Sequence, residues 1–278
     1  VLATLSGTVV PCTITATNAS GCLTFKFVSN GSIRSSGWTA ALSCVTTIPA
    51  PLAGTVCSNA PFMTLPYTAT GQTTQCYGDD YNNSSPGSCG TYSDSGEDRV
   101  YAYTPTSNEC IGISITNAST IYIGYELYSG CPGSTGTTCV ASDGGSTSLS
   151  GNTTLTAGTT YYLVIDTWAS PNYATYDLSV SSFGSGPVND LPCNATPLTL
   201  GVTESGDNTC SGSTGEPAAP GCWTTGNNNS VWYKVVPTGT TLKIKTIVGT
   251  LTNTQIALYS GTCGASLAMV TSGCNDDA

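Results

Sequence analysis

The feature that most constrains the fold of this chain is its cysteine content. The 278 residues include 14 cysteines and no histidine. No two cysteines have the Cys-x-x-Cys spacing, so zinc sites and thioredoxin-like redox sites lack their usual ligands and geometry. Disulfide bonds are the better interpretation, and they persist in oxidising compartments. The sequence therefore indicates a secreted or cell-surface protein.

The charge of the chain is low and negative. Only 8% of its residues are charged, and the formal net charge is -10. Such a chain lacks the cations that neutralise nucleic-acid phosphates, and an anionic membrane surface repels it. No apolar run approaches the ~18 residues that cross a bilayer. We expect neither a nucleic-acid partner nor membrane insertion.

Short strand-like segments dominate the sequence. They are rich in β-branched and aromatic residues, and clusters of Gly, Pro, Asn and Ser separate them. Clear examples are residues 23–27, 111–115, 161–165 and 242–247. No segment has a convincing helical period. The pattern predicts an all-β protein made of tandem, disulfide-rich, jelly-roll-like β-sandwich domains.

The sequence LYSG occurs at residues 127–130 and 258–261, and it belongs to a longer repeat. The matching cysteines are Cys57 and Cys193, Cys76 and Cys210, Cys89 and Cys222, Cys131 and Cys263, and Cys139 and Cys274, whereas Cys110 has no counterpart. The repeat predicts one sandwich at residues 57–182 and a second at 193–278, with linkers at 45–56 and 183–192.

The second copy lacks the last two strands predicted for the first, at residues 153–166 and 176–180. A sandwich without them would expose unpaired edges. We expect either that the chain continues or that another molecule supplies the strands; one candidate donor is the segment 1–44 of another copy.

Two resemblances extend this interpretation. Residues 21–44, with the pattern FxFxSN followed by GW and a cysteine, resemble the C-terminal half of a CUB-like domain, which predicts a separate domain at 1–44. The two copies resemble bacterial pre-peptidase C-terminal β-sandwiches, on the segments CNATPL, VWYKVVP and TQIALYSGTCGASLAMVTSGCNDDA, and on LTAGTTYYLVID in the first copy only. The resemblance implies large exported proteins, as in Bacteroidetes, whose modules are adhesive, carbohydrate-contacting or spacer units.

Proximity along the chain predicts five disulfide bonds. The expected pairs are Cys131 with Cys139, Cys263 with Cys274, Cys76 with Cys89, Cys210 with Cys222, and Cys12 with Cys22. Each would close a short loop beside a strand. The remaining cysteines, Cys44, Cys57, Cys110 and Cys193, stay unassigned.

Two sets of loop residues are candidate ligand contacts. Calcium takes several oxygens at once, so the clustered carboxylates Asp79, Asp80, Glu97, Asp98, Asp276 and Asp277 are candidate ligands, with solvated turn residues as the alternative. The loop aromatics Trp168, Tyr173 and Trp223 could stack on sugar rings or cover the end of a sandwich. Several Asn-x-Ser/Thr triplets, such as those at Asn18 and Asn194, are candidate glycosylation sites.

Nothing in the sequence supports catalysis. Histidine, the commonest general base, is absent, and no Gly-x-Ser-x-Gly or Ser-x-x-Lys motif occurs. We expect a non-catalytic extracellular structural or adhesive protein that requires no cofactor, a segment of a surface stalk, adhesin or filament. Its partners would be further domains of a longer chain or other copies of itself. The alternative is a polysaccharide-binding accessory module of a secreted hydrolase or protease.

Overall fold

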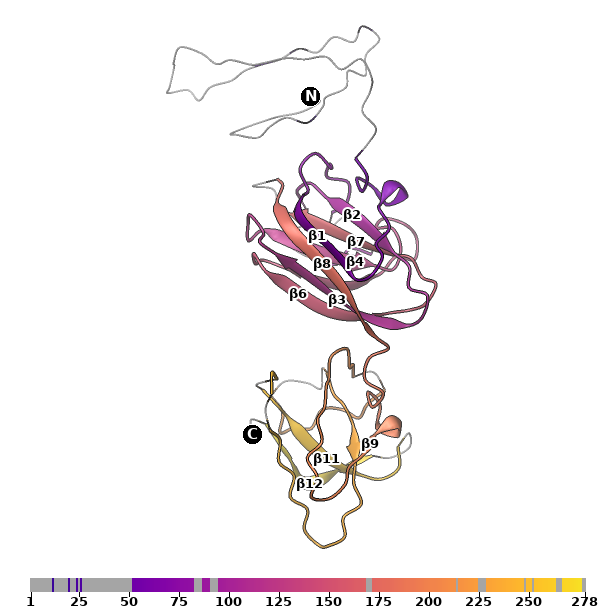
Figure 1. Cartoon of the computed structure of the whole chain (residues 1–278), viewed down its shortest axis with the longest axis vertical. Helices are drawn as coiled ribbons and strands as arrows, with labels where there is room; N and C mark the ends of the chain where they lie inside the picture. The colour runs from indigo at the N-terminus through magenta and orange to yellow at the C-terminus, as the bar shows by residue number, and fades with distance from the viewer. Residues whose placement is uncertain are drawn as a thin grey trace, which may run out of the picture.

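The computed structural model describes the chain from Leu52 onward with short gaps. The described residues are 52–82, 87–90, 95–168, 172–213, 215–224, 229–247, 249–251, 253–263 and 267–276, together with the single positions Cys12, Ser20, Thr24 and Lys26. The predicted CUB-like domain at 1–44 and the strand expected at 23–27 therefore lie outside the described residues, apart from those single positions. Figure 1 shows a sandwich, residues 52–184, followed by a C-terminal unit, residues 187–276.

The sandwich consists of two four-stranded sheets in which all neighbouring strands are antiparallel. One sheet has the order β1 (Tyr67–Thr73), β8 (Thr175–Gly184), β3 (Glu109–Thr116) and β6 (Leu149–Leu155). The other has the order β2 (Arg99–Tyr103), β7 (Tyr161–Thr167), β4 (Ile123–Tyr128) and β5 (Cys139–Gly144). A short 3-10 helix, η1 (Cys57–Asn59), precedes β1. The predicted all-β, disulfide-rich sandwich fold is confirmed.

The core lies between the two sheets. In β3, the alternating Ile111, Ile113 and Ile115 are buried, as the period of two in a strand requires when one face packs inward. The facing sheet contributes residues such as Tyr125 and Leu163 to the same cluster. The strands predicted at 111–115 and 161–165 lie within β3 and β7, because both have the alternating or continuous apolar pattern of core strands.

The last two strands of the sandwich occupy central positions. β7 pairs with β2 on one side and with β4 on the other, and β8 lies between β1 and β3. Leu163 in β7 is opposite Tyr101 of β2 and Leu127 of β4. Both sheets are therefore completed only when the end of the domain sequence is in place.

The C-terminal unit has short ladders in its described part. A second 3-10 helix, η2 (Pro192–Asn194), precedes β9 (Thr196–Pro197), which pairs in parallel with β10 (Tyr233–Lys234). β11 (Ile256–Ser260), which contains the second LYS sequence, pairs with β12 (Ala268–Asn275) in the antiparallel sense. Of the unit's described apolar residues, Ala195 is buried, whereas Val236 and Ile247 are exposed by 84% and 73%.

The strand expected at residues 242–247 is not formed, so that prediction was wrong. Its counterpart in the sandwich is β3, which is hydrogen-bonded on both sides, to β8 and β6. The described residues of the C-terminal unit offer no strand that corresponds to β8. Without a neighbouring strand, an apolar alternation does not form a ladder.

Leu163 tests the central position of β7. Its side chain is 1% exposed, so the Leu163→Ala variant should lose about 2–5 kcal/mol of unfolding free energy through lost burial and a cavity. Denaturant unfolding with the disulfides intact measures this loss. The Val188→Ala variant is the control, because Val188 is 79% exposed and its truncation should change stability by less than about 0.5 kcal/mol. Equal losses in the two variants would contradict the assignment.

Candidate functional site

Five disulfide bonds join the described cysteines. They are Cys12–Cys76, Cys57–Cys131, Cys89–Cys139, Cys110–Cys210 and Cys222–Cys274. The five pairings predicted from proximity are wrong: Cys131 with Cys139, Cys263 with Cys274, Cys76 with Cys89, Cys210 with Cys222, and Cys12 with Cys22. Cys22 itself lies outside the described residues.

The corrected pairing follows from the sandwich topology. A disulfide needs Cα atoms about 4.4–6.8 Å apart, and in a β-sandwich such neighbours come from elements distant in sequence. Cys139, for example, begins β5 and bonds to Cys89, which is 50 residues away. Cys131 follows β4 and bonds to Cys57 at the start of η1, which is 74 residues away. The loops between consecutive strands are thus fastened to other loops rather than closed on themselves.

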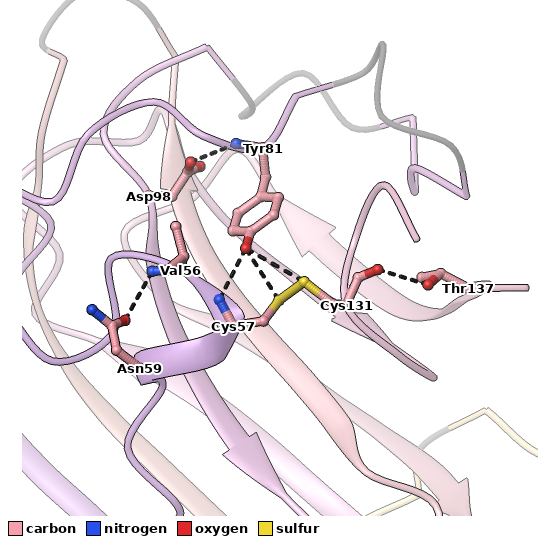
Figure 2. The surroundings of a disulfide bond; sticks show 7 residues. All are labelled: Val56, Cys57, Asn59, Tyr81, Asp98, Cys131 and Thr137. Atoms are coloured by element: carbon pink, nitrogen blue, oxygen red, sulfur yellow. Dashed lines mark hydrogen bonds between the residues drawn. A yellow bond between two sulfur atoms is a disulfide. The ribbon is translucent and has the colours of Figure 1, made fainter. Parts of the chain in front are cut away.

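The Cys57–Cys131 bond lies in a network of side chains at one end of the sandwich (Figure 2). The Tyr81 hydroxyl accepts a hydrogen bond from the Cys57 backbone N–H at 2.9 Å and donates one to Cys57 Sγ at 3.1 Å. Asp98 Oδ2 accepts from the Tyr81 backbone N–H at 2.8 Å. Burial raises the pKa of Tyr81, so its hydroxyl stays protonated. The bond therefore anchors the loop that carries Tyr81 as well as η1 and the segment after β4.

Two of the disulfides connect successive parts of the chain. Cys110 of β3 bonds to Cys210 of the C-terminal unit, and Cys76 of the sandwich bonds to Cys12, upstream of it. Cys76 and Cys210 match in the predicted repeat, and both have left-handed backbones, with φ of 75° and 68°. Residues other than glycine rarely adopt this backbone conformation. The same backward link thus occurs at two equivalent positions.

A polar cleft lies at the junction of the sandwich and the C-terminal unit. Residues 152–154 of β6 line one side, and Asp190, Asn208 and Ser211 line the other. Asp190 Oδ1 accepts the Gly212 backbone N–H at 2.7 Å. The Cys110–Cys210 bond lies at this junction, so the cleft marks where the two parts are joined.

Three buried acidic side chains lie in or next to the second sheet. Asp98, Asp166 and Glu126 are 0%, 1% and 5% exposed. The β2–β7 register pairs Arg99 with Ile165, which places Asp98 opposite Asp166 just beyond the ladder. The sequence analysis missed Asp166 and Glu126, because only strand register brings them near Asp98.

The two buried aspartates resist ionisation. Burial is the main cause that raises the pKa of Asp98 and of Asp166 above the ordinary 3.8, and the nearby charge of Asp98 raises the pKa of Asp166 further. Asp98 Oδ2 also accepts the Tyr81 N–H, and Asp166 Oδ1 accepts the Gly96 N–H at 3.3 Å.

The candidate calcium ligands face backbone donors. Glu97 Oε2 accepts the Cys76 N–H, and Asp98 Oδ2 accepts the Asp80 N–H. Asp276 lies apart from them and accepts from Thr224 and Gln255. In the described part of the chain, no group of three or more His, Cys, Asp or Glu side chains has the geometry of a metal site. Asp79 belongs to the described residues but to no such group, and Asp277 lies outside the described residues. Calcium binding therefore stays a prediction.

Among the candidate sugar-contacting aromatics, Trp168 is the exposed one. It directly follows β7 and is 44% exposed, whereas Tyr173 and Trp223 are partly buried. The Trp223 Nε1–H donates to the Asn275 carbonyl at 3.3 Å, which ties that ring to β12. The Trp168 N–H donates to the carbonyl of Tyr122, itself 48% exposed. Tyr122 was not predicted as a neighbour of Trp168, because only the pairing of β4 with β7 brings the two residues together.

Comparisons with known proteins leave the family open. No protein-family model and no curated protein matches the chain. The chain is similar to the solved pre-peptidase C-terminal domain of collagenase from Bacillus anthracis, at 20% identity over 44% of this chain and 94% of that one, with a TM-score of 0.32. It is also similar to the GH26-CBM35 β-(1,4)-mannanase of Podospora anserina, at 16% identity over 36% and 22%, with a TM-score of 0.21. Both similarities are too low to assign a family or a function.

The described residues contain no helix long and apolar enough to cross a membrane.

The buried aspartate pair predicts a pH dependence of stability. Folding raises both pKa values above 3.8. Between pH 3.8 and the folded pKa values, the folded state therefore holds more protons than the unfolded state. The pair's contribution is therefore complete below about pH 4 and is lost as pH rises through the folded pKa values. We expect the melting temperature of the Asp166→Asn variant to depend less on pH across this range than that of the unchanged chain.

The matched control is Asp177→Asn. Asp177 is partly exposed, and hydrogen bonds from Asn117 and the Gly71 N–H lower its pKa. This variant should keep the loss of stability with rising pH. An Asp166→Asn variant with the same pH slope as the unchanged chain would contradict the raised pKa values of the pair.

Proposed function

We propose that this chain is a non-catalytic extracellular structural segment, in which consecutive β-sandwich units are joined into a stalk or filament. The observation that carries the proposal is the backward disulfide at two equivalent positions, Cys12–Cys76 and Cys110–Cys210. Each of these bonds connects one unit to the part of the chain before it. The partners of such a segment are further domains of a longer chain or other copies of itself.

A second covalent link changes the mechanics of a domain junction. Two domains joined by one flexible linker reorient freely unless a large interface holds them. Here the linker after Gly184 contains glycine and the 79% exposed Val188, and the buried Asn189 that follows hydrogen-bonds to Trp232. The Cys110–Cys210 bond adds a second attachment at a separate point. Two attachments restrict rotation about the junction, which favours a load-bearing or spacing role.

The junction can be tested with the double variant Cys110→Ser and Cys210→Ser. Loss of the second attachment should widen the distribution of distances between the sandwich and the C-terminal unit. Small-angle X-ray scattering of the full chain measures this through the radius of gyration and the maximum dimension. The control is Cys89→Ser with Cys139→Ser, which opens a bond inside the sandwich. An unchanged scattering profile in the first variant would refute the mechanical role of the bond.

The assembled state decides between a filament and an isolated module. Electron microscopy of the native material at the cell surface or in the medium should reveal long, regular fibres or stalks. Their subunit mass should exceed the calculated 28.2 kDa or form a ladder that resists detergent. Discrete monomers of about that mass would contradict the structural proposal.

A second candidate function is polysaccharide binding by an accessory module. The observation that favours it is the exposed pair Trp168 and Tyr122, held side by side by a backbone hydrogen bond of 2.9 Å. Aromatic faces bury the apolar faces of sugar rings, and their positions on adjacent strand ends are fixed by the β4–β7 ladder.

The Trp168→Ala variant tests this second candidate. If the pair binds polysaccharide, removal of the indole should weaken binding about tenfold, which corresponds to about 1.4 kcal/mol. Affinity electrophoresis against a panel of soluble polysaccharides gives the measurement. Phe62→Ala is the control, because Phe62 is an exposed aromatic, by 69%, that lies before β1. Equal weakening in both variants, or no binding by the unchanged chain, would reject the candidate.

A further inference from the structure

The C-terminal unit repeats the local structure around the Cys57–Cys131 bond. Cys57 begins the 3-10 helix η1, and Cys193 lies within the 3-10 helix η2. After each helix the chain forms a parallel contact with a later strand: the Met63 N–H donates to the Ala102 carbonyl at 2.8 Å, and the Leu198 N–H donates to the Lys234 carbonyl at 2.8 Å. The two helices are therefore equivalent in sequence and in the pairing that follows them.

The other end of the bond has an equivalent as well. β4 ends at Tyr128 and leads through Ser129 and Gly130 to Cys131. β11 ends at Ser260 and leads through Gly261 to Cys263. Each strand forms a bulged antiparallel pair with the next strand, β5 or β12. Cys263 thus occupies the position of Cys131.

The remaining cysteines of the C-terminal unit already follow the bonds of the sandwich. Cys222 bonds to Cys274 as Cys89 bonds to Cys139. Cys210 bonds to the preceding part of the chain, as Cys76 does. Of the internal bonds of the sandwich, Cys57–Cys131 is therefore the one without an observed counterpart in the described part of the C-terminal unit.

The two matching thiols lie near each other. Cys193 and Cys263 are both exposed and carry free thiols in the structure, and the Cys263 side chain is near enough to raise the pKa of Cys193. The fold thus brings together two cysteines that are far apart in sequence. Exposed thiols that lie near each other are accessible to an oxidant, and each has a partner for disulfide formation.

We propose that Cys193 and Cys263 form a disulfide bond in the mature protein. Each unit then has two internal disulfides and one backward link. The bond forms by exchange with an external disulfide oxidant: the thiolate of one cysteine attacks the oxidant's disulfide and forms a mixed disulfide, and the second thiolate displaces the oxidant's other sulfur. Two electrons and two protons pass from the cysteine pair to the oxidant, which leaves as a dithiol.

Peptide mapping of the full chain, produced in an oxidising compartment such as a bacterial periplasm, tests the proposal. The protein is denatured without reductant, alkylated and digested, so that each cysteine is read separately by mass spectrometry. The expected product is a linked peptide pair containing Cys193 and Cys263, without alkylation at either residue and with two hydrogens fewer than the sum of the reduced peptides. The Cys222–Cys274 peptide pair reports that oxidation is complete.

Two results would overturn the proposal. One is alkylation of both Cys193 and Cys263 in a sample where the Cys222–Cys274 pair is linked. The other is a link from either residue to a different cysteine. The Cys263→Ser variant adds a check on the partner: Cys193 should then become fully alkylated, and a Cys193 that stays protected would contradict the pairing. The outcome does not depend on the proposed structural role, because it concerns connectivity alone.

Discussion

The first sandwich depends on two ladders formed by the last part of its sequence. β7 and β8 are central in their sheets, so β2, β4, β1 and β3 all take hydrogen bonds from them. Without these strands, four rows of backbone donors and acceptors would lose a partner, and the apolar face of Ile111, Ile113 and Ile115 would lose part of its cover. Both sheets are thus complete only when the whole domain sequence is in place.

Disulfide bonds and strand pairing contribute differently to the stability of the two parts of the chain. The sandwich buries a continuous apolar cluster between complete sheets, and its disulfides fasten loops at the ends. In the described part of the C-terminal unit, the ladders are two-stranded and few apolar residues, such as Ala195, are buried. Small ladders rarely hold by themselves. The Cys110–Cys210 and Cys222–Cys274 bonds therefore matter more for holding this unit together.

The sequence predicted strands well and contacts poorly, for a physical reason. Alternation and β-branched residues reveal β3 and β7, because side-chain direction is local and has a period of two. Disulfide partners and the Asp98–Asp166 pair depend on register and sheet order, which local patterns do not encode. Proximity along the chain therefore misplaced Cys131 and Cys139. Residues 242–247 show the converse: a strand pattern forms a ladder only where a neighbour is present.

The bond between Cys110 and Cys210 also closes a covalent ring that includes the exposed linker after Gly184. Exposed linkers rich in small residues are the preferred sites of proteolytic nicking. A single cut at Val188 would open the ring without releasing either part, because the disulfide still connects them. A nicked chain would remain one molecule until it met a reductant. The junction therefore tolerates a single cut at the exposed Val188.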